Sequence, residues 1–409
     1  MIYLDNAATT FPKPKIVYKE MDRINRECSV NAGRGLYKLA NEANLIINDT
    51  KKLLRELINA DVSTPLVFTP SVTIALNQII NGLELKKDAI VYVSPYEHNA
   101  VARTLHHFSK HNFIQIKQLP INGETLELDI DKIKFEFAKN HPSAIFCTHI
   151  SNVIGYILPV EEIFTEGKKY GSINILDTAQ SLGLIEVNSK KINADIIAFA
   201  GHKSLYGPFG IGGFANITGI KLKEYITGGT GSNSLNLNMP DDLESKYEPA
   251  SHNIIAIAGL RAALKDLSSK MLPKSSIGGA VTKVTEGAAM RSIAVTGGFL
   301  TNTNEKSLTN YLIDSLSKIK GIKLFLPSNR DNHIGIVSFV LKDFKSEDVG
   351  MILDEDFGIA VRTGYHCAPF IHEYLSDKDS LGTVRVSLGR FNTKTDIDRL
   401  AVALKSINE

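Results

Sequence analysis

The sequence is poor in cysteine and in net charge. Its 409 residues include only three cysteines, Cys28, Cys147 and Cys367, which are far apart and odd in number. This spacing fits neither a disulfide framework nor a cluster of metal ligands, so we expect no metal site. The 46 Lys and Arg residues nearly balance the 44 Asp and Glu residues, leaving a formal net charge of +2. Such a balance gives no support to nucleic acid as a partner, which would require a basic stripe.

Long apolar runs are also missing. No run approaches the roughly 20 residues that cross a bilayer, so we expect no membrane partner. The first residues, MIYLDNAATTFPKP, lack the basic and apolar regions of a signal peptide. Together with the few, dispersed cysteines, these absences predict a protein of the reducing cytoplasm.

The composition and the length indicate a globular protein of more than one domain. Hydrophobic residues make up 43% and charged residues 22% of the chain, as in ordinary globular domains. A chain of 409 residues exceeds what one hydrophobic core usually organises, so we expect two domains.

Short apolar runs alternate with helical patterns in the first half of the chain. The helical stretches are 73–83, 99–110 and 160–170, and the apolar runs are 66–68, 89–93, 144–150, 173–176 and 195–200. Continuously apolar runs are typical of strands buried on both faces, and this alternation predicts a wound, mainly parallel α/β sheet. In such sheets ligands bind at the carboxyl ends of the strands.

A second unit begins near residue 301. Apolar residues keep helical spacing over 308–319, strand-like runs follow at 323–326, 335–341 and 383–388, and a last helix starts near Thr393. This pattern predicts a smaller α+β domain. Between the two units, residues 272–300 are rich in Gly, Ser, Thr and Ala with weak periodicity, and we interpret them as a loop or insertion.

Two charged residues follow neighbouring strands of the predicted sheet. Asp177, in ILDTAQS, comes directly after a buried strand, and Lys203, in AFAGHKSLYGPFGIGG, follows the next one. A carboxylate there needs a positive partner, such as the protonated ring nitrogen of pyridoxal phosphate. A buried lysine readily loses its proton, which suits Schiff-base chemistry. Taken alone, Asp177 is better explained as a helix cap. A surface lysine in a Gly-rich turn is the common alternative for Lys203, and it is less attractive here because Lys203 follows Asp177 by one strand unit.

Two further segments lie at expected strand ends. In FTPSVTIALNQI, a polar turn precedes a helix whose N-terminus, with Ser71 and Thr73, would form a phosphate site, although such caps are common. His98, in VSPYEHNA, follows another strand and could stack on a flat cofactor ring or could simply begin a helix.

The segment VRTGYHCAP groups Arg362, His366 and Cys367. A thiol beside such groups can have its pKa lowered from about 8.5 and act as a nucleophile. A lone cysteine is more often structural, as we expect for Cys147 within the apolar run AIFCTHI.

Taken together, these motifs resemble the cysteine desulfurases of the class V aminotransferase group. The ordered combination DxAQ, GHK and RxGxHCA carries the resemblance, which extends from LDNAATTFPKP to RVSLGRFNTKTDIDRL. It implies a fold type I pyridoxal-phosphate-dependent enzyme: a large domain with a mainly parallel sheet and a smaller C-terminal α+β domain. The boundaries would be an N-terminal segment 1–20 packing with the small domain, a cofactor-binding domain 21–270, an atypical segment 271–300, and a domain 301–409 carrying the catalytic cysteine.

The resemblance also implies a role for each matching residue. Lys203 would hold the cofactor covalently, and Cys367 would take sulfur from L-cysteine as a persulfide and release alanine. The remaining cofactor contacts would come from Asp177 at the ring nitrogen, Gln180 at the ring hydroxyl, His98 stacked on the ring, Thr73 and His202 at the phosphate, and Ser251 reaching the phosphate of a second subunit. The substrate would be held by Asn152, Arg385, Arg362 and Arg34. A homodimer and a sulfur-acceptor protein, in iron–sulfur cluster assembly or another sulfur pathway, are the implied partners.

The sequence departs from the family pattern at several positions. Ala200 stands where a Ser or Thr usually precedes GHK, Ile74 where Glu is common, and Ala250–Ser251 where Gly–Thr is usual. Selenocysteine lyase and a class V aminotransferase or epimerase are alternatives with a similar cofactor site. A noncatalytic scaffold or sulfur-relay protein is an alternative of a different class, and these substitutions are its support.

Overall fold

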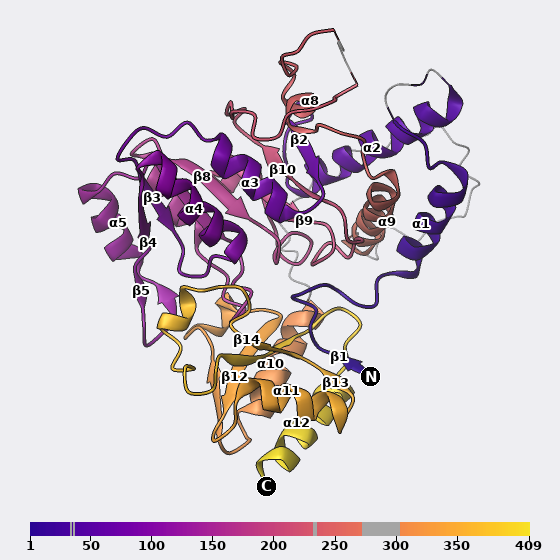
Figure 1. The fold of residues 1–409 in the computed structure, drawn as a ribbon. Coiled ribbons are helices and arrows are strands. Elements are labelled where there is room, and N and C mark those ends of the chain that lie inside the picture. The colour runs from indigo at the N-terminus through magenta and orange to yellow at the C-terminus, as the bar shows by residue number, and fades with distance from the viewer. Residues whose placement is uncertain (33–34, 36, 232–234, 272–302) are drawn as a thin grey trace, which may run out of the picture.

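The computed structural model describes residues 1–32, 35, 37–231, 235–271 and 303–409. The predicted segment 271–300 lies, apart from Met271, outside the described residues. Figure 1 shows two layered units: a larger one built on a seven-stranded sheet, and a smaller one, orange to yellow, formed by the C-terminal part of the chain.

The large sheet confirms the predicted fold class. Its strands lie in the order β2 (Leu66–Thr69), β10 (Gly212–Asn216), β9 (Ile196–Ala200), β8 (Ile173–Asp177), β7 (Ala144–Thr148), β3 (Ile90–Val93) and β4 (Gln115–Gln118). Neighbouring strands from β9 to β4 are parallel, and β10 is antiparallel to both β9 and β2. The sequence reading did not predict β4 or β10.

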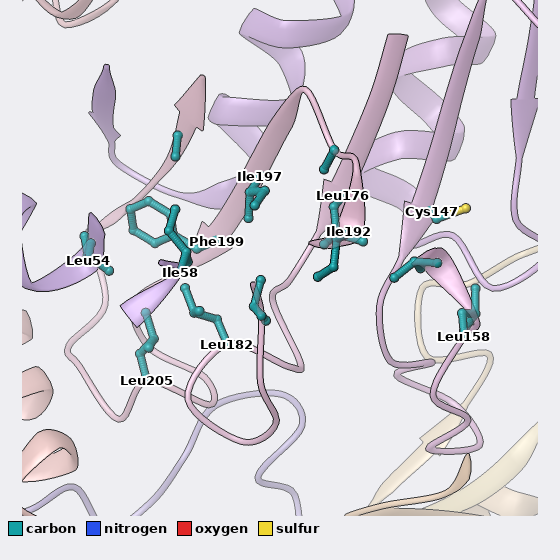
Figure 2. Close-up of a cluster of buried hydrophobic side chains, with 14 of the residues drawn as sticks. Leu54, Ile58, Cys147, Leu158, Leu176, Leu182, Ile192, Ile197, Phe199 and Leu205 are labelled. Carbon is teal, nitrogen blue, oxygen red and sulfur yellow. The ribbon is translucent and has the colours of Figure 1, made fainter. Parts of the chain in front are cut away.

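Helices cover both faces of this sheet. One apolar cluster lies beneath α3 (Val72–Gly82) and α4 (Asn99–Asn112), and another beneath α5 (Ile130–Lys139), α6 (Val160–Lys168) and α9 (Ile254–Met271). Figure 2 shows part of the second cluster, with Cys147 among its side chains, as expected of a core cysteine. Cys28 is also buried, at 1% exposed, where it ends α1 (Lys15–Glu27). At one end of the unit, α9 packs against α1 and α2 (Lys38–Leu57) (Figure 1).

The smaller unit has its own antiparallel sheet, in the order β11 (Ile322–Phe325), β12 (Ile336–Leu341), β15 (Thr383–Ser387) and β14 (Arg362–Gly364). Its helices are α10 (Thr303–Leu316), α11 (Ser346–Glu355) and α12 (Lys394–Asn408). The first strand of the chain, β1 (Ile2–Tyr3), pairs in parallel with β13 (Ile359–Ala360), beside this unit (Figure 1). The exact domain boundaries remain a prediction. None of the described helices combines the length and the apolarity that crossing a membrane requires.

Candidate active site

Asp177 and Lys203 lie at the carboxyl ends of two adjacent parallel strands. Asp177 ends β8, is 4% exposed, and its Oδ1 accepts a hydrogen bond of 2.8 Å from the backbone N–H of Ala179. Lys203 comes three residues after the end of β9. Burial raises the pKa of Asp177, which the charge of Lys203 opposes. Burial also lowers the pKa of Lys203, which Asp177 opposes. Asp177 therefore stabilises a turn rather than capping a helix. The negative charge of Asp177 and the positive charge of Lys203 each favour the charged form of the other group.

The loop that carries Lys203 is fixed by the N-terminal segment. The hydroxyls of Thr9 and Thr10 donate to the carbonyl of His202 at 2.9 and 3.3 Å, and Thr10 also donates to the carbonyl of Lys203 at 3.1 Å. The His202 ring stacks on Phe209 with centroids 4.7 Å apart. Its Nδ1 is buried and has no hydrogen-bond partner among the described residues. Residues from the start of the chain thus hold the backbone on both sides of the Lys203 side chain.

Gln180 comes three residues after Asp177, at the carboxyl end of β8. Its Nε2 donates to the carbonyl of Ala7 at 2.9 Å. The turn before α3 lies at the end of β2, where the Ser71 hydroxyl accepts from the N–H of Ile74 at 3.3 Å. A side chain at Gly212 would come within 2.6 Å of the N–H of Val72, so glycine lets β10 pass close to this helix start. Thr73, the predicted phosphate ligand, is exposed in the first turn of α3.

His98 is both a helix start and a neighbour of Lys203. Its Nδ1 accepts from the N–H of Ala100 at 3.1 Å, so it is the N-cap of α4. Burial, with Lys203 and the site arginines adding to the effect, lowers its pKa to about 3. The ring is therefore neutral at physiological pH, whereas its stacking on a cofactor remains a prediction.

Cys367 lies in a turn against these residues. The Arg362 Nη2 donates to Cys367 Sγ at 3.2 Å. The carbonyl of Cys367 accepts from the N–H of Asn99 at 2.6 Å, and Asn152 Nδ2 donates to the carbonyl of His366 at 2.8 Å. The cysteine turn of the small unit is thus bonded to the strand ends of the large one, and Cys367 also lines a cleft of about 1160 Å³ between this turn, α4 and β4.

Arg385 is the largest of the fully buried side chains, at 1% exposed. Its Nη1 donates to the carbonyl of Asn152 at 2.9 Å, and its Nη2 pairs with Asp5 Oδ1 at 2.7 Å. Its Nε has no hydrogen-bond partner among the described residues. Arg385, which we predicted to bind the substrate carboxylate, is therefore already paired with one carboxylate, that of Asp5. The sequence analysis did not single out Asp5.

Comparison with known proteins shows which family has this arrangement. The family model described as aminotransferase class-V matches residues 2–277 and 281–400. The chain belongs to the aminotransferase class-V family. The resemblance stated from the sequence is thereby confirmed.

The relatives of this class V chain carry consistent names. A "Probable cysteine desulfurase" of Methanothermobacter thermautotrophicus is 29% identical over 415 residues, covering 99% of this chain and 94% of the relative. Another from Halalkalibacterium halodurans is 30% identical, covering 100% and 93%. The apo structure of a cysteine desulfurase from Thermococcus onnurineus NA1 is similar with a TM-score of 0.82 and 26% identity, covering 99% of this chain and 94% of that one.

Two predicted site residues of the class V chain are not placed in this group. Arg34 lies outside the described residues. Ser251 is exposed, and its hydroxyl accepts from Asn31 Nδ2 at 3.2 Å. Ala200, in place of the family's hydroxyl residue, ends β9 at 2% exposed and so adds only apolar surface.

One buried acid was missed by the sequence reading. Glu97 is 0% exposed, and its Oε1 accepts from the Ser94 hydroxyl and from the N–H of Thr148, each at 2.6 Å. Its Oε2 has no hydrogen-bond partner among the described residues. Burial, with a further contribution from Asp177, raises its pKa to about 8. Its position next to His98 after a buried strand was the available signal.

Proposed function

We propose that this class V protein is a pyridoxal-phosphate-dependent cysteine desulfurase that keeps the sulfur on Cys367. The observation that carries the proposal is the meeting of two reactive groups, a half-buried Lys203 beside Asp177 and a cysteine thiol contacted by Arg362. The names of relatives that match nearly the whole chain support the same activity.

The residues present fit pyridoxal phosphate. Among the described residues, no hydrogen bond or ion pair reaches Lys203 Nζ, so this amine is free to bond an aldehyde carbon. Asp177 would face the ring nitrogen, Gln180 the ring hydroxyl and His98 the ring face. The start of α3, with Thr73, and the unpartnered His202 Nδ1 are suited to a phosphate. When bound there, the cofactor would supply an electron sink for charge at the substrate Cα.

The protein's own groups then bind the substrate and move its protons. Arg385, fixed by Asp5 and Asn152, would bind the carboxylate of L-cysteine through its remaining N–H groups. The lowered pKa of Lys203 increases the share of neutral amine, which can accept the Cα proton. Arg362, from β14 just before the turn that holds Cys367, would line the same pocket.

The sulfur step needs no outside oxidant. The Cys367 thiolate attacks the substrate sulfur, an S–S bond forms as the Cβ–S bond breaks, and the electron pair of the broken bond stays with the three-carbon fragment. Proton return to that fragment gives L-alanine, and Cys367 keeps the sulfur as a persulfide.

The cleft beside Cys367 supports sulfur transfer to an acceptor. Because Cys367 lines this cleft of about 1160 Å³, a persulfide there could be reached from outside. Arg103 and Lys378 add positive charge to the walls, against one carboxylate from Glu373. We infer an acceptor protein with an acidic contact surface, in a cytoplasmic setting. The exposed Ser251 would face a second subunit in a homodimer.

Replacing the thiol tests the proposal. Cys367→Ser should still change absorbance on adding L-cysteine but should form neither persulfide nor alanine, because serine cannot hold sulfane sulfur. Cys28→Ala is the matched control: Cys28 is buried in the apolar core near α1, and its variant should turn over like the original protein. Alanine and persulfide production that survives in Cys367→Ser would overturn the mechanism.

A further inference from the structure

The turn that carries the thiol has an unfavourable backbone conformation. His366 and Cys367 are consecutive residues with positive φ, at 48° and 57°. Left-handed conformations cost L-residues roughly 1–2 kcal/mol each, so such a turn persists only where surrounding contacts hold it. The direction of Cys367 Sγ therefore depends on those contacts.

Each carbonyl of the turn has a hydrogen bond from outside. The contacts at His366 and Cys367 come from Asn152 and Asn99, as described above, and the His366 ring bonds the Thr383 hydroxyl at 2.8 Å. The carbonyl of Tyr365, two residues before the nucleophile, lies 3.0 Å from His372 Nε2. This carbonyl also accepts the turn's closing hydrogen bond, from the N–H of Ala368 at 3.1 Å, so His372 adds a second contact, from outside the turn, to its first residue.

His372 is in turn fixed by a buried carboxylate. Its Nδ1 lies 2.5 Å from Asp377 Oδ2, and the two residues are 6% and 0% exposed. One ring nitrogen thus contacts the carboxyl of Asp377 and the other the carbonyl of Tyr365, so the His372 ring bridges the two. The edge of the Tyr365 ring packs on His372 with centroids 5.0 Å apart. The second Asp377 oxygen, Oδ1, is buried without a hydrogen-bond partner among the described residues. The contact with His372 is therefore the side-chain hydrogen bond of Asp377 among these residues.

We propose that the His372–Asp377 pair is a positioning device for Cys367, which holds the strained turn so that Sγ meets the substrate sulfur. The inference rests on the proposed function for its catalytic consequence, but not for its effect on the thiol itself. His372 also lines the cleft that Cys367 lines.

Two variants test the pair in the full-length holoenzyme. His372→Ala removes the contact to the Tyr365 carbonyl, and Asp377→Asn keeps the shape but removes the charge. Misplacing a reacting group by about 1 Å can cost roughly 100-fold in rate, so we expect kcat for alanine release to fall about 10-fold or more in His372→Ala. The half-saturating cysteine concentration, read from absorbance, should stay within about 2-fold, because the substrate contacts of Arg385 are unchanged. Asp377→Asn should fall in the same direction.

Alkylation of the thiol separates this inference from the proposed activity. Cys28 and Cys147 are each 1% exposed, so iodoacetamide reports on Cys367 in the folded protein. We expect its alkylation rate to change several-fold in both variants. If the original protein releases no alanine, the proposed function fails. The alkylation rates of the variants still test whether the His372–Asp377 pair positions Cys367.

A distant histidine provides the control. His141 is exposed and stacks on Tyr170, and His141→Ala should leave kcat and the alkylation rate unchanged. Unchanged kcat and alkylation in His372→Ala would overturn the proposal. So would a loss of thermal stability in both variants with unchanged alkylation of the folded protein, because the pair would then be structural only.

Discussion

At the scale of single residues, the site combines two buried carboxyls with different partners. Asp177 has the charge of Lys203 nearby, whereas Glu97 has only a hydroxyl and a backbone N–H as hydrogen-bond donors. Burial without a cation is why the pKa of Glu97 rises to about 8. Glu97 is therefore protonated in the native protein at neutral pH, immediately before the N-cap of α4.

Glu97→Gln should change how stability depends on pH. Between pH 5 and 8 the native carboxyl keeps a proton that the unfolded chain, with its pKa near 4.5, has lost. Stability of the original protein therefore falls as pH rises through this window, by at most about 1.4 kcal/mol per unit from this group. Glutamine cannot ionise. The urea midpoint of Glu97→Gln minus that of the original protein should therefore increase as the pH is raised from 5.5 to 7.5. A constant difference across these pH values would show that Glu97 is ionised in the native state.

At the scale of elements, the last helix shows how local sequence sets a boundary. The Thr393 hydroxyl accepts from the N–H of Asp396 at 3.4 Å, and Asp396 Oδ2 accepts from the N–H of Thr393 at 2.9 Å. This capping box satisfies two N–H groups at the start of α12. The helix then buries Ile397, Leu400 and Leu404 against the small sheet.

Thr393→Ala should destabilise the small unit by about 1 kcal/mol, because the cap is lost while the packing stays. Thr395→Ala is the matched control: Thr395 is exposed in the first turn and should change stability by less than about 0.5 kcal/mol. Urea unfolding followed by circular dichroism measures both. Equal effects of the two variants would mean that the capping box contributes nothing.

At the scale of the whole molecule, the N-terminal segment connects the two units. Ile2 and Leu4 belong to the apolar cluster of the small unit, Asp5 pairs with Arg385, and Thr9 and Thr10 hold the loop of Lys203. The site is thus assembled from the start, the middle and the end of the chain.

Acid should destabilise the molecule well before its carboxylates are protonated. Burial lowers the pKa of His98 to about 3 and those of His149, His202 and His333 to about 4. These folded-state values lie below the unfolded value of about 6.5, so their contribution to stability is present above pH 6.5 and is lost as pH falls toward 4. Glu97 and Asp177, whose pKa values burial raises, act in the opposite direction but are two groups against these four. We expect the thermal midpoint to be lower at pH 5 than at pH 7; an equal or higher midpoint at pH 5 would contradict this balance.

The sequence by itself determined the elements that are apolar and regular, and the order of the reactive residues. The runs before Asp177 and Lys203 are strands buried on both faces, so their pattern is continuous and their ends could be placed. The sequence did not reveal β10, because Gly212–Asn216 lacks β-branched residues and is a strand only through pairing with β2 and β9. A side chain at Gly213 would lie 2.0 Å from the carbonyl of Val67, which is why glycine occupies this place.

Only the tertiary structure decided which side chains meet. Asp5 and Arg385 are 380 residues apart, and no spacing rule predicts a contact at such a separation. The left-handed turn at Cys367 likewise lacks the glycine or asparagine that usually occupies positive φ. Contacts from Asn99, Asn152 and His372 add to its own closing hydrogen bond, from the N–H of Ala368 to the carbonyl of Tyr365. Local propensity acts over a few residues, whereas the positions of buried charges follow from packing of the complete chain.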